Sequence, residues 1–163
     1  MNSIIYPINK MTIQNSNYKN ISERILWLFD TYNIIVKSSE ETGGKYILVE
    51  GYFKPNSLIP LHLHKTIDEF FLVLDGKVEV QYGNKKMVAN EGDELLVKKG
   101  TPHSLRNINN DMSKLIRLIN QGWFQNFFME AGTEVPDIFS EPKRKITHDD
   151  IRNISRKYDT ELL

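Results

Sequence analysis

The chain has 163 residues, enough for one domain with its own core, and its 21 basic residues balance its 21 acidic residues. This neutral balance argues against nucleic acid or an anionic membrane surface as a partner. The absence of cysteine excludes disulfides, thiolate metal sites and cysteine nucleophiles.

The middle of the chain is predicted to be β-structure, because short apolar runs recur at close spacing between turn-forming residues. Residues 22–29 fit a helical turn or a strand equally well. Asp75-Gly76 and Gly83-Asn84 are predicted to be hairpin turns, since such pairs adopt positive φ angles. So many short strands without intervening helices predict an all-β antiparallel sandwich or barrel. The predicted strands are Tyr32–Val36, Lys45–Phe53, Leu61–His64, Phe70–Leu74, Lys77–Tyr82, Lys85–Ala89, Glu94–Val97, His103–Asn107 and Ser113–Ile119.

Helices are expected towards the C-terminal end. Residues 123–131 fit a short helix, and Thr147 with Asp150 three residues later forms a capping box that would begin a final helix. Residues 133–142, between the two helices, are predicted to be a linker. We therefore expect a single domain, residues 1–163, divided into an N-terminal extension (1–31), a β-barrel core (32–120) and a C-terminal helical extension (121–163).

Three of the four histidines lie in two short windows that could form a metal site. His62 and His64 are two residues apart, so on a strand both side chains point to the same face. Glu69 begins the next strand, where a hairpin or tight corner would bring it beside this pair, and His103 begins a later strand. Three imidazoles and one carboxylate suit a first-row divalent metal. Four protein ligands on an octahedral ion leave about two positions open for water, oxygen or substrate.

The alternative is that each histidine is an ordinary hydrogen-bonded residue, as we expect for His148 in the first turn of the final helix. For His62, His64 and His103 this alternative requires three independent coincidences of position. The sequence therefore favours a metal site over three unrelated histidines.

The same residues resemble the two motifs of the cupin superfamily. The first motif, glycine–five–His–x–His–four–Glu–six–glycine, is matched in register by His62, His64, Glu69 and Gly76. The second, glycine–five–proline–x–glycine–two–His–three–asparagine, is matched by Gly92, Gly100, His103 and Asn107. Asn56 and Lys98 stand where the motifs have glycine and proline. Asparagine tolerates a left-handed backbone, so this departure leaves the metal site intact.

The resemblance extends from about residue 42 to 132, and the chain is similar to short single-domain cupins related to bacterial quercetin 2,3-dioxygenases. It implies an antiparallel jelly-roll barrel, usually dimeric, with the metal at its centre. It also implies one divalent transition metal per chain, which could be Fe, Mn, Ni, Co, Zn or Cu. In flavonol-cleaving members the metal-bound glutamate takes the substrate's hydroxyl proton, and Glu69 is the matching position. Alternatively, Glu69 is only a ligand.

The likeness thus implies a metal-dependent dioxygenase acting on a small enolic or phenolic, flavonol-like compound. Two alternatives stay open, because the cupin fold hosts both: a non-catalytic small-molecule-binding protein, and a metal-dependent isomerase, cyclase or lyase that does not use oxygen.

Other side chains near the expected site are assigned by their strand phase. Phe71, Val73 and Leu105 should point into the barrel, as cavity lining or as plain core. Arg117 is predicted to face solvent, with the alternative that it faces the cavity and holds an anionic substrate. Asp68, out of phase with Glu69, should lie outside the cavity.

Residues 1–10 lack the basic start and apolar run of a signal peptide, and no apolar stretch is long enough to span a membrane. We therefore expect a cytoplasmic protein with a small-molecule substrate and no nucleic-acid or membrane partner. The resemblance and the aromatic residues 123–128 also predict a homodimer, since small barrels often cover sheet edges with a partner.

Overall fold

Two central strands show a strict alternation of buried and half-exposed residues, because successive side chains on a strand point to opposite faces. In β3 (Ile47–Phe53) and β10 (Ser113–Ile119), every second residue is buried.

The computed structural model describes residues 21–143 and 145–163. The expectations for residues 1–10, and for most of the extension 1–31, lie outside the described residues.

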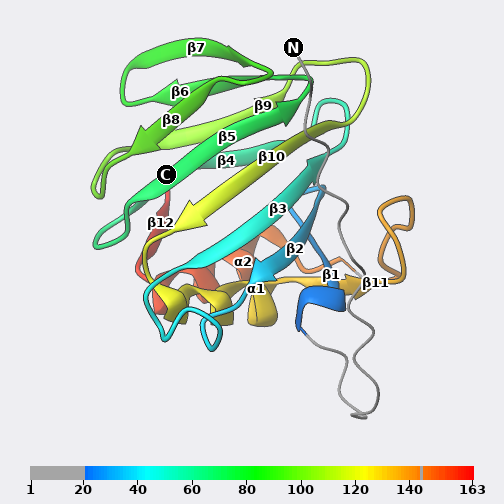
Figure 1. Ribbon diagram of the computed structural model, residues 1–163, viewed down its shortest axis with the longest axis vertical. Coiled ribbons are helices and arrows are strands. Elements are labelled where there is room, and N and C mark those ends of the chain that lie inside the picture. The colour runs from blue at the N-terminus through cyan, green and yellow to red at the C-terminus, as the bar shows by residue number, and fades with distance from the viewer. Residues whose placement is uncertain (1–20, 144) are drawn as a thin grey trace, which may run out of the picture.

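The strands form two antiparallel sheets that face each other (Figure 1). In spatial order, the seven-stranded sheet contains β11 (Thr133–Val135), β1 (Ile25–Leu28), β2 (Thr31–Lys37), β3, β10, β5 (Glu69–Asp75) and β8 (Glu94–Val97). The five-stranded sheet contains β12 (Thr160–Leu162), β4 (Leu58–His64), β9 (His103–Asn107), β6 (Lys77–Tyr82) and β7 (Lys85–Asn90). The fold is therefore the all-β, antiparallel jelly-roll barrel that was predicted.

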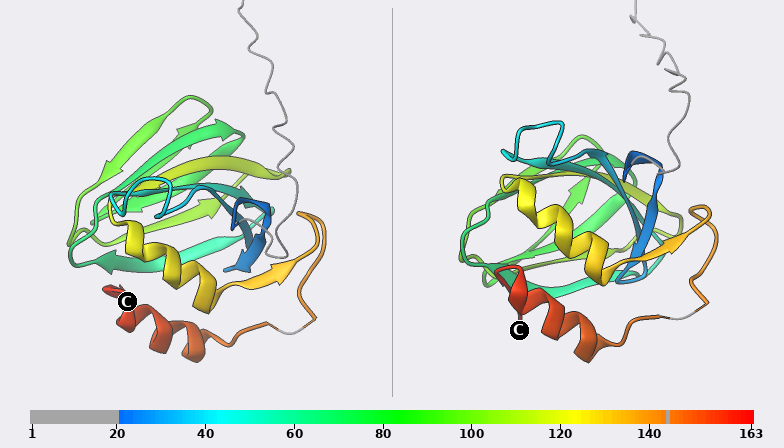
Figure 2. Two further views of the ribbon diagram at one scale, coloured as in Figure 1. Left: turned by 60° about the horizontal axis from the view of Figure 1, so that its bottom comes forward. Right: turned by 90° about the horizontal axis from the view of Figure 1, so that it is seen from below.

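Short helices cover one end of the barrel, as Figure 2 shows. They are a 3-10 turn at Gly122–Phe124, α1 (Gln125–Ala131) and α2 (His148–Lys157). Thr147 and Asp150 form both hydrogen bonds of the predicted capping box at the start of α2. Within the described residues, no helix is long and apolar enough to cross a membrane.

All nine predicted strands are present, with bounds that differ from the prediction by three residues at most. The segment 22–29 contains both of the elements considered for it, a 3-10 turn at Ile21–Glu23 followed by β1. Asn56 has a φ of 64°, the left-handed conformation expected where the first motif has glycine.

Three local predictions are wrong. Asp75-Gly76 is not a hairpin turn, because β5 and β6 belong to different sheets. Gly76 instead forms a tight corner, with a φ of 79° and no room for a Cβ beside Ser113 Oγ. The linker 133–142 contains β11, which pairs with β1. The C-terminal extension is not purely helical, because β12 joins the five-stranded sheet outside the predicted barrel bounds of 32–120.

Candidate metal centre

Four side chains from three strands converge at the end of the barrel that the helices cover. His62 and His64 share the inward face of β4, Glu69 begins β5, and His103 begins β9 opposite His62. All four are buried, and one ligand atom from each lies within 4.8 Å of the others. The corner between β4 and β5, which join different sheets, brings Glu69 beside the two histidines.

Each imidazole uses its Nδ1 atom outside the cluster. His62 Nδ1 lies 2.7 Å from the Pro60 carbonyl oxygen, and His103 Nδ1 lies 3.0 Å from the carbonyl oxygen of Thr101. A carbonyl only accepts hydrogen bonds, so both Nδ1 atoms carry the hydrogen. Interactions of this kind fix the ring tautomer and orient a metal-binding histidine.

His64 is held by the C-terminal strand. Its Nδ1 lies 2.8 Å from the hydroxyl oxygen of Thr160, which pairs with His64 in the β12–β4 register. The Thr160 hydroxyl donates its own hydrogen to the Tyr158 carbonyl oxygen at 3.0 Å. Thr160 must therefore accept from His64, whose Nε2 atom is left free to face the cluster.

The inward atoms are all hydrogen-bond acceptors when the imidazoles are neutral. Glu69 Oε2 lies 3.3 Å from His64 Nε2 and 3.4 Å from His103 Nε2, so lone pairs face lone pairs. Such a buried set needs a cation to balance it, either protons on the imidazoles or a metal ion. The residues present therefore fit a divalent metal and could hold one.

Burial and the neighbouring groups shift two pKa values within the cluster. Burial, reinforced by the charges of His103 and His64, holds the pKa of His62 well below its usual range. Burial alone would raise the pKa of Glu69. When His103 and His64 carry the balancing protons, their hydrogen bonds and charge outweigh burial and hold the Glu69 pKa well below its usual range. The neutral His62 and the ionised Glu69 are the protonation states that metal binding requires.

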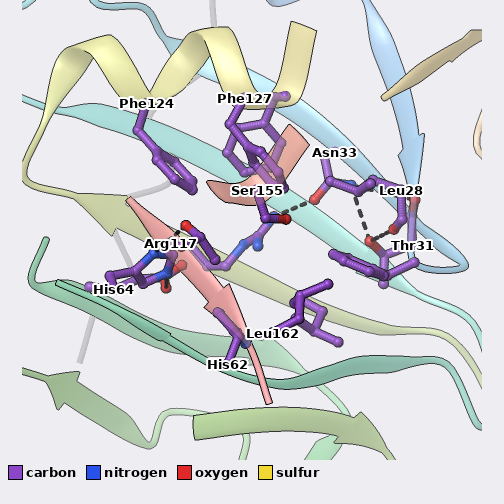
Figure 3. A pocket seen from close by; sticks show the side chains of 15 residues that line it. Leu28, Thr31, Asn33, His62, His64, Arg117, Phe124, Phe127, Ser155 and Leu162 are labelled. Carbon is purple, nitrogen blue, oxygen red and sulfur yellow. Dashed lines mark hydrogen bonds and ion pairs between the residues drawn. The ribbon is translucent and has the colours of Figure 1, made fainter. Parts of the chain in front are cut away.

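A small cavity of about 30 Å³ adjoins the cluster (Figure 3). Most of its wall is apolar and comes from β1, β4, the 3-10 turn at Gly122–Phe124, α1 and β12, with Leu28, Ile59, Phe124, Phe127 and Leu162 among the side chains. The polar part comprises three residues of the cluster, His62, His64 and Glu69, and five others: Thr31, Asn33, Arg117, Ser155 and Thr160. The volume is roughly enough for two water molecules.

Comparisons with known proteins agree with this geometry. Residues 49–118 match the family model described as a cupin domain. The central part of the barrel, residues 49–118, is a cupin domain. A quercetin 2,3-dioxygenase from Bacillus subtilis is 28% identical over 103 residues, which cover 63% of this chain and 30% of that protein. An uncharacterized protein from Methanocaldococcus jannaschii is 31% identical over 74 residues, covering 45% of this chain and 59% of that protein.

Neither curated relative is matched over two thirds of its own length. Among solved structures, a predicted oxalate decarboxylase from Thermotoga maritima superposes with a TM-score of 0.57 at 20% identity. That match covers 63% of this chain and 96% of the other. At this identity the likeness shows the cupin fold alone.

The structure also decides between the alternatives for the neighbouring residues. Phe71, Val73 and Leu105 are plain core in the apolar half of the cupin barrel and do not line the cavity. Asp68 lies outside the cavity, as predicted, where it pairs with Lys98. Arg117 does not face solvent, because it is only 5% exposed and lines the cavity. The solvent-facing prediction fails because the inner side of β10 includes position 117, where apolar neighbours at 115 and 119 share the same face.

Two residues beside the site were not foreseen. Thr160 comes from a three-residue strand, too short to show an alternating pattern, and Asn33 lies inside an otherwise apolar strand. A buried amide in an apolar strand does indicate an internal hydrogen-bond partner, and that was the one available signal.

Proposed function

We propose that this cupin is a metal-dependent dioxygenase that acts on a small enolic or phenolic compound. One divalent transition metal per chain would be held by His62, His64, Glu69 and His103. The observation that carries the proposal is the convergence of four buried acceptor groups, three of which are imidazoles whose Nδ1 atoms already have partners outside the cluster. The match to a quercetin 2,3-dioxygenase supports oxygen chemistry on an enol.

A bound divalent ion would lower the pKa of a hydroxyl or enol oxygen that coordinates it. In this proposal Glu69 serves as general base, because a carboxylate at the metal centre lies within hydrogen-bond reach of such an oxygen. The carboxylate is ionised, so a Glu69 oxygen that the metal does not hold can accept the substrate's proton. The phenylalanines of α1 and Leu162 of β12 exclude bulk water from this transfer.

The size of the cavity favours the smaller members of this substrate class. A volume of about 30 Å³ is far below the roughly 300–1,000 Å³ of pockets that hold drug-sized ligands. A flavonol would therefore require α2 and β12 to move away from the barrel end. A compound of a few heavy atoms needs only the displacement of water and small side-chain shifts.

The decisive experiment is elemental analysis of the purified protein, followed by oxygen uptake with β-diketones, β-keto acids and flavonols. We expect close to one divalent ion per chain and oxygen consumption with at least one enolic compound. Protein without a divalent ion after reconstitution with each candidate metal would disprove the metal centre. Conversion without oxygen consumption would replace the dioxygenase by a metal-dependent isomerase or lyase, and ligand binding without conversion would leave a binding protein.

We also propose that the protein is a homodimer. The phenylalanines of residues 123–128 pack within their own chain, so they are not the contact. At the far end of the barrel, β7 and β8 are the edge strands of their sheets and expose Met87, Val88 and Leu96. Light scattering should give twice the 19.0 kDa chain mass, and Val88→Lys should shift that mass towards the monomer. A monomeric wild-type protein at micromolar concentration would contradict the proposal.

A further inference from the structure

A buried arginine lies beside the metal centre. Arg117 stands on β10 opposite Phe71 of β5, and Glu69 is two residues further along that neighbouring strand. Arg117 and Glu69 therefore point to the same face and both line the cavity. Figure 3 shows the Arg117 side chain between His64 and Asn33.

The guanidinium of Arg117 has few partners. One of its terminal nitrogens donates to Asn33 Oδ1, and its Nε has no hydrogen-bond partner among the described residues. Asn33 is fixed in this orientation because its amide nitrogen donates to the carbonyl oxygens of Leu26 and Thr31. The Phe128 ring centroid lies 5.3 Å from the guanidinium carbon of Arg117.

No carboxylate in the described part of the chain lies within 4.0 Å of this cation. Burial lowers the pKa of Arg117 and the charge of Glu69 opposes that shift, but an arginine remains protonated at neutral pH. Fully buried arginines are rare unless they are paired, because an uncompensated buried charge is strongly destabilising. Glu69 influences Arg117 through its charge but forms no ion pair with it, and a metal at the cluster would share that charge.

We propose that Arg117 binds the carboxylate of the substrate, so that the substrate of this cupin is a small enolisable acid. The inference rests on the proposed function for the metal centre, where the enolic oxygen of that acid would lie. Diagonal neighbours on adjacent strands have side chains that start on the order of 7–8 Å apart. The acid group and the reacting oxygen are therefore a few bonds apart, as in a β-keto acid.

The test compares two probes of nearly equal size, acetoacetate and acetylacetone, which differ by a carboxylate oxygen in place of a methyl group. Their affinities are measured by calorimetry without oxygen, on the protein with the metal it holds as purified. Wild-type protein should bind acetoacetate at least about 10-fold more tightly, because truncating a buried charge pair costs at least that factor. Arg117→Met should remove this preference, and Arg117→Lys should keep part of it.

Arg106→Gln is the matched control, since it also removes one positive charge, but from an exposed position on β9. It should leave the preference unchanged. Equal affinities of wild-type protein for both probes, no measurable binding of acetoacetate, or a preference that survives in Arg117→Met would each overturn the proposal. The affinities of wild-type protein for the two probes test the proposal even if Arg117→Met does not fold.

The experiment also separates this inference from the proposed function. A preference for the acid that depends on Arg117, in a protein that consumes no oxygen with acetoacetate, supports the acid site and contradicts the dioxygenase. Oxygen consumption with acetylacetone at an affinity equal to that for acetoacetate supports the dioxygenase and contradicts the acid site.

Discussion

The two halves of the barrel interior are built from the same strands but carry opposite chemistry. On β5, Glu69 lies in the ligand cluster, whereas Phe71 and Val73, two and four residues further on, are buried among apolar side chains. The same holds on β9, where His103 lies in the ligand cluster and Leu105, two residues further on, is buried among apolar side chains. The strand period of two places all of these side chains on the inward face. The position along the strand therefore decides whether a residue serves the site or the core.

The two halves are also closed in different ways. In the apolar half, side chains of the facing sheets pack directly against one another. In the ligand half the side chains of the facing sheets cannot pack against each other in this way, because their polar atoms face inward. The helices cover it instead (Figure 2), where Phe124, Phe127 and Ile151 belong to a second apolar cluster together with buried residues of β1, β2, β3 and β10. The stability of the barrel and the closure of the site are thus largely separate properties.

The largest effect is expected from Glu69→Gln. The amide keeps the shape and an oxygen that could ligate a metal, but it cannot accept a proton as a carboxylate does. Turnover should fall by about 10²–10⁴-fold, the usual contribution of a general base, while some metal is retained. Metal content and turnover are measured on the same sample. Near-normal turnover with bound metal would leave Glu69 as a ligand alone.

His103→Ala and Leu105→Ala form a matched pair across the boundary between the two halves. Both residues are buried on the same face of β9, two positions apart. His103→Ala should weaken metal binding by more than the roughly 10–100-fold that loss of an outer hydrogen-bond partner costs. Leu105→Ala should instead lower the free energy of unfolding by about 2–5 kcal/mol, with unchanged metal per folded chain.

Elemental analysis and denaturant unfolding of both variants provide the measurements, with the exposed His148→Ala as the neutral control. Full metal occupancy in His103→Ala would show that the assigned ligand set is wrong. Loss of metal from folded Leu105→Ala would show that the two halves are coupled.

A smaller effect is expected from Thr160→Val, which keeps the shape of the side chain but removes the oxygen that accepts from His64 Nδ1. The buried imidazole would then lose the contact that sets its tautomer. Metal affinity should fall by about 10–100-fold, as for other outer-sphere partners. Competition with a chelator measures the change, and Thr160→Ser, which keeps the hydroxyl, should bind nearly as the wild type does. Equal affinities of the Val and Ser variants would refute this role.

Local patterns were sufficient to predict the ligand half of β4. Two histidines at a spacing of two share a face on any strand, whatever sheet the strand joins. Asn56 and the Thr147–Asp150 pair are predictable for the same reason, since their conformations depend on neighbours in sequence. The four candidate ligands could therefore be chosen from the sequence, and the structure brings all of them together.

Features that depend on distant partners could not be predicted in this way. Asp75-Gly76 has the composition of a hairpin turn, but the corner arises because β5 pairs with β10 while β6 pairs with β9. β12 pairs with β4, far away in sequence, and the backbone N–H groups of Lys65 and Thr66, after β4, donate to the backbone and side chain of Asp159. Arg117 could be placed on either face until its neighbours across the sheet were known.

The smallest effect is expected from Thr147→Ala, which removes the N-cap of α2. Loss of such a cap lowers stability by about 0.5–2 kcal/mol. Here it should destabilise α2 and β12 rather than the rest of the barrel. Helix α2 packs on α1 and β12, and its Ser155 forms part of the cavity wall. Hydrogen exchange should therefore become faster in α2 and β12 and stay unchanged in β6 and β9. Thr147→Ser retains the capping oxygen and should exchange as the wild type does. Faster hydrogen exchange in all strands alike would mean that the helices and the barrel open together. The stability of the barrel and the closure of the site would then not be separate properties.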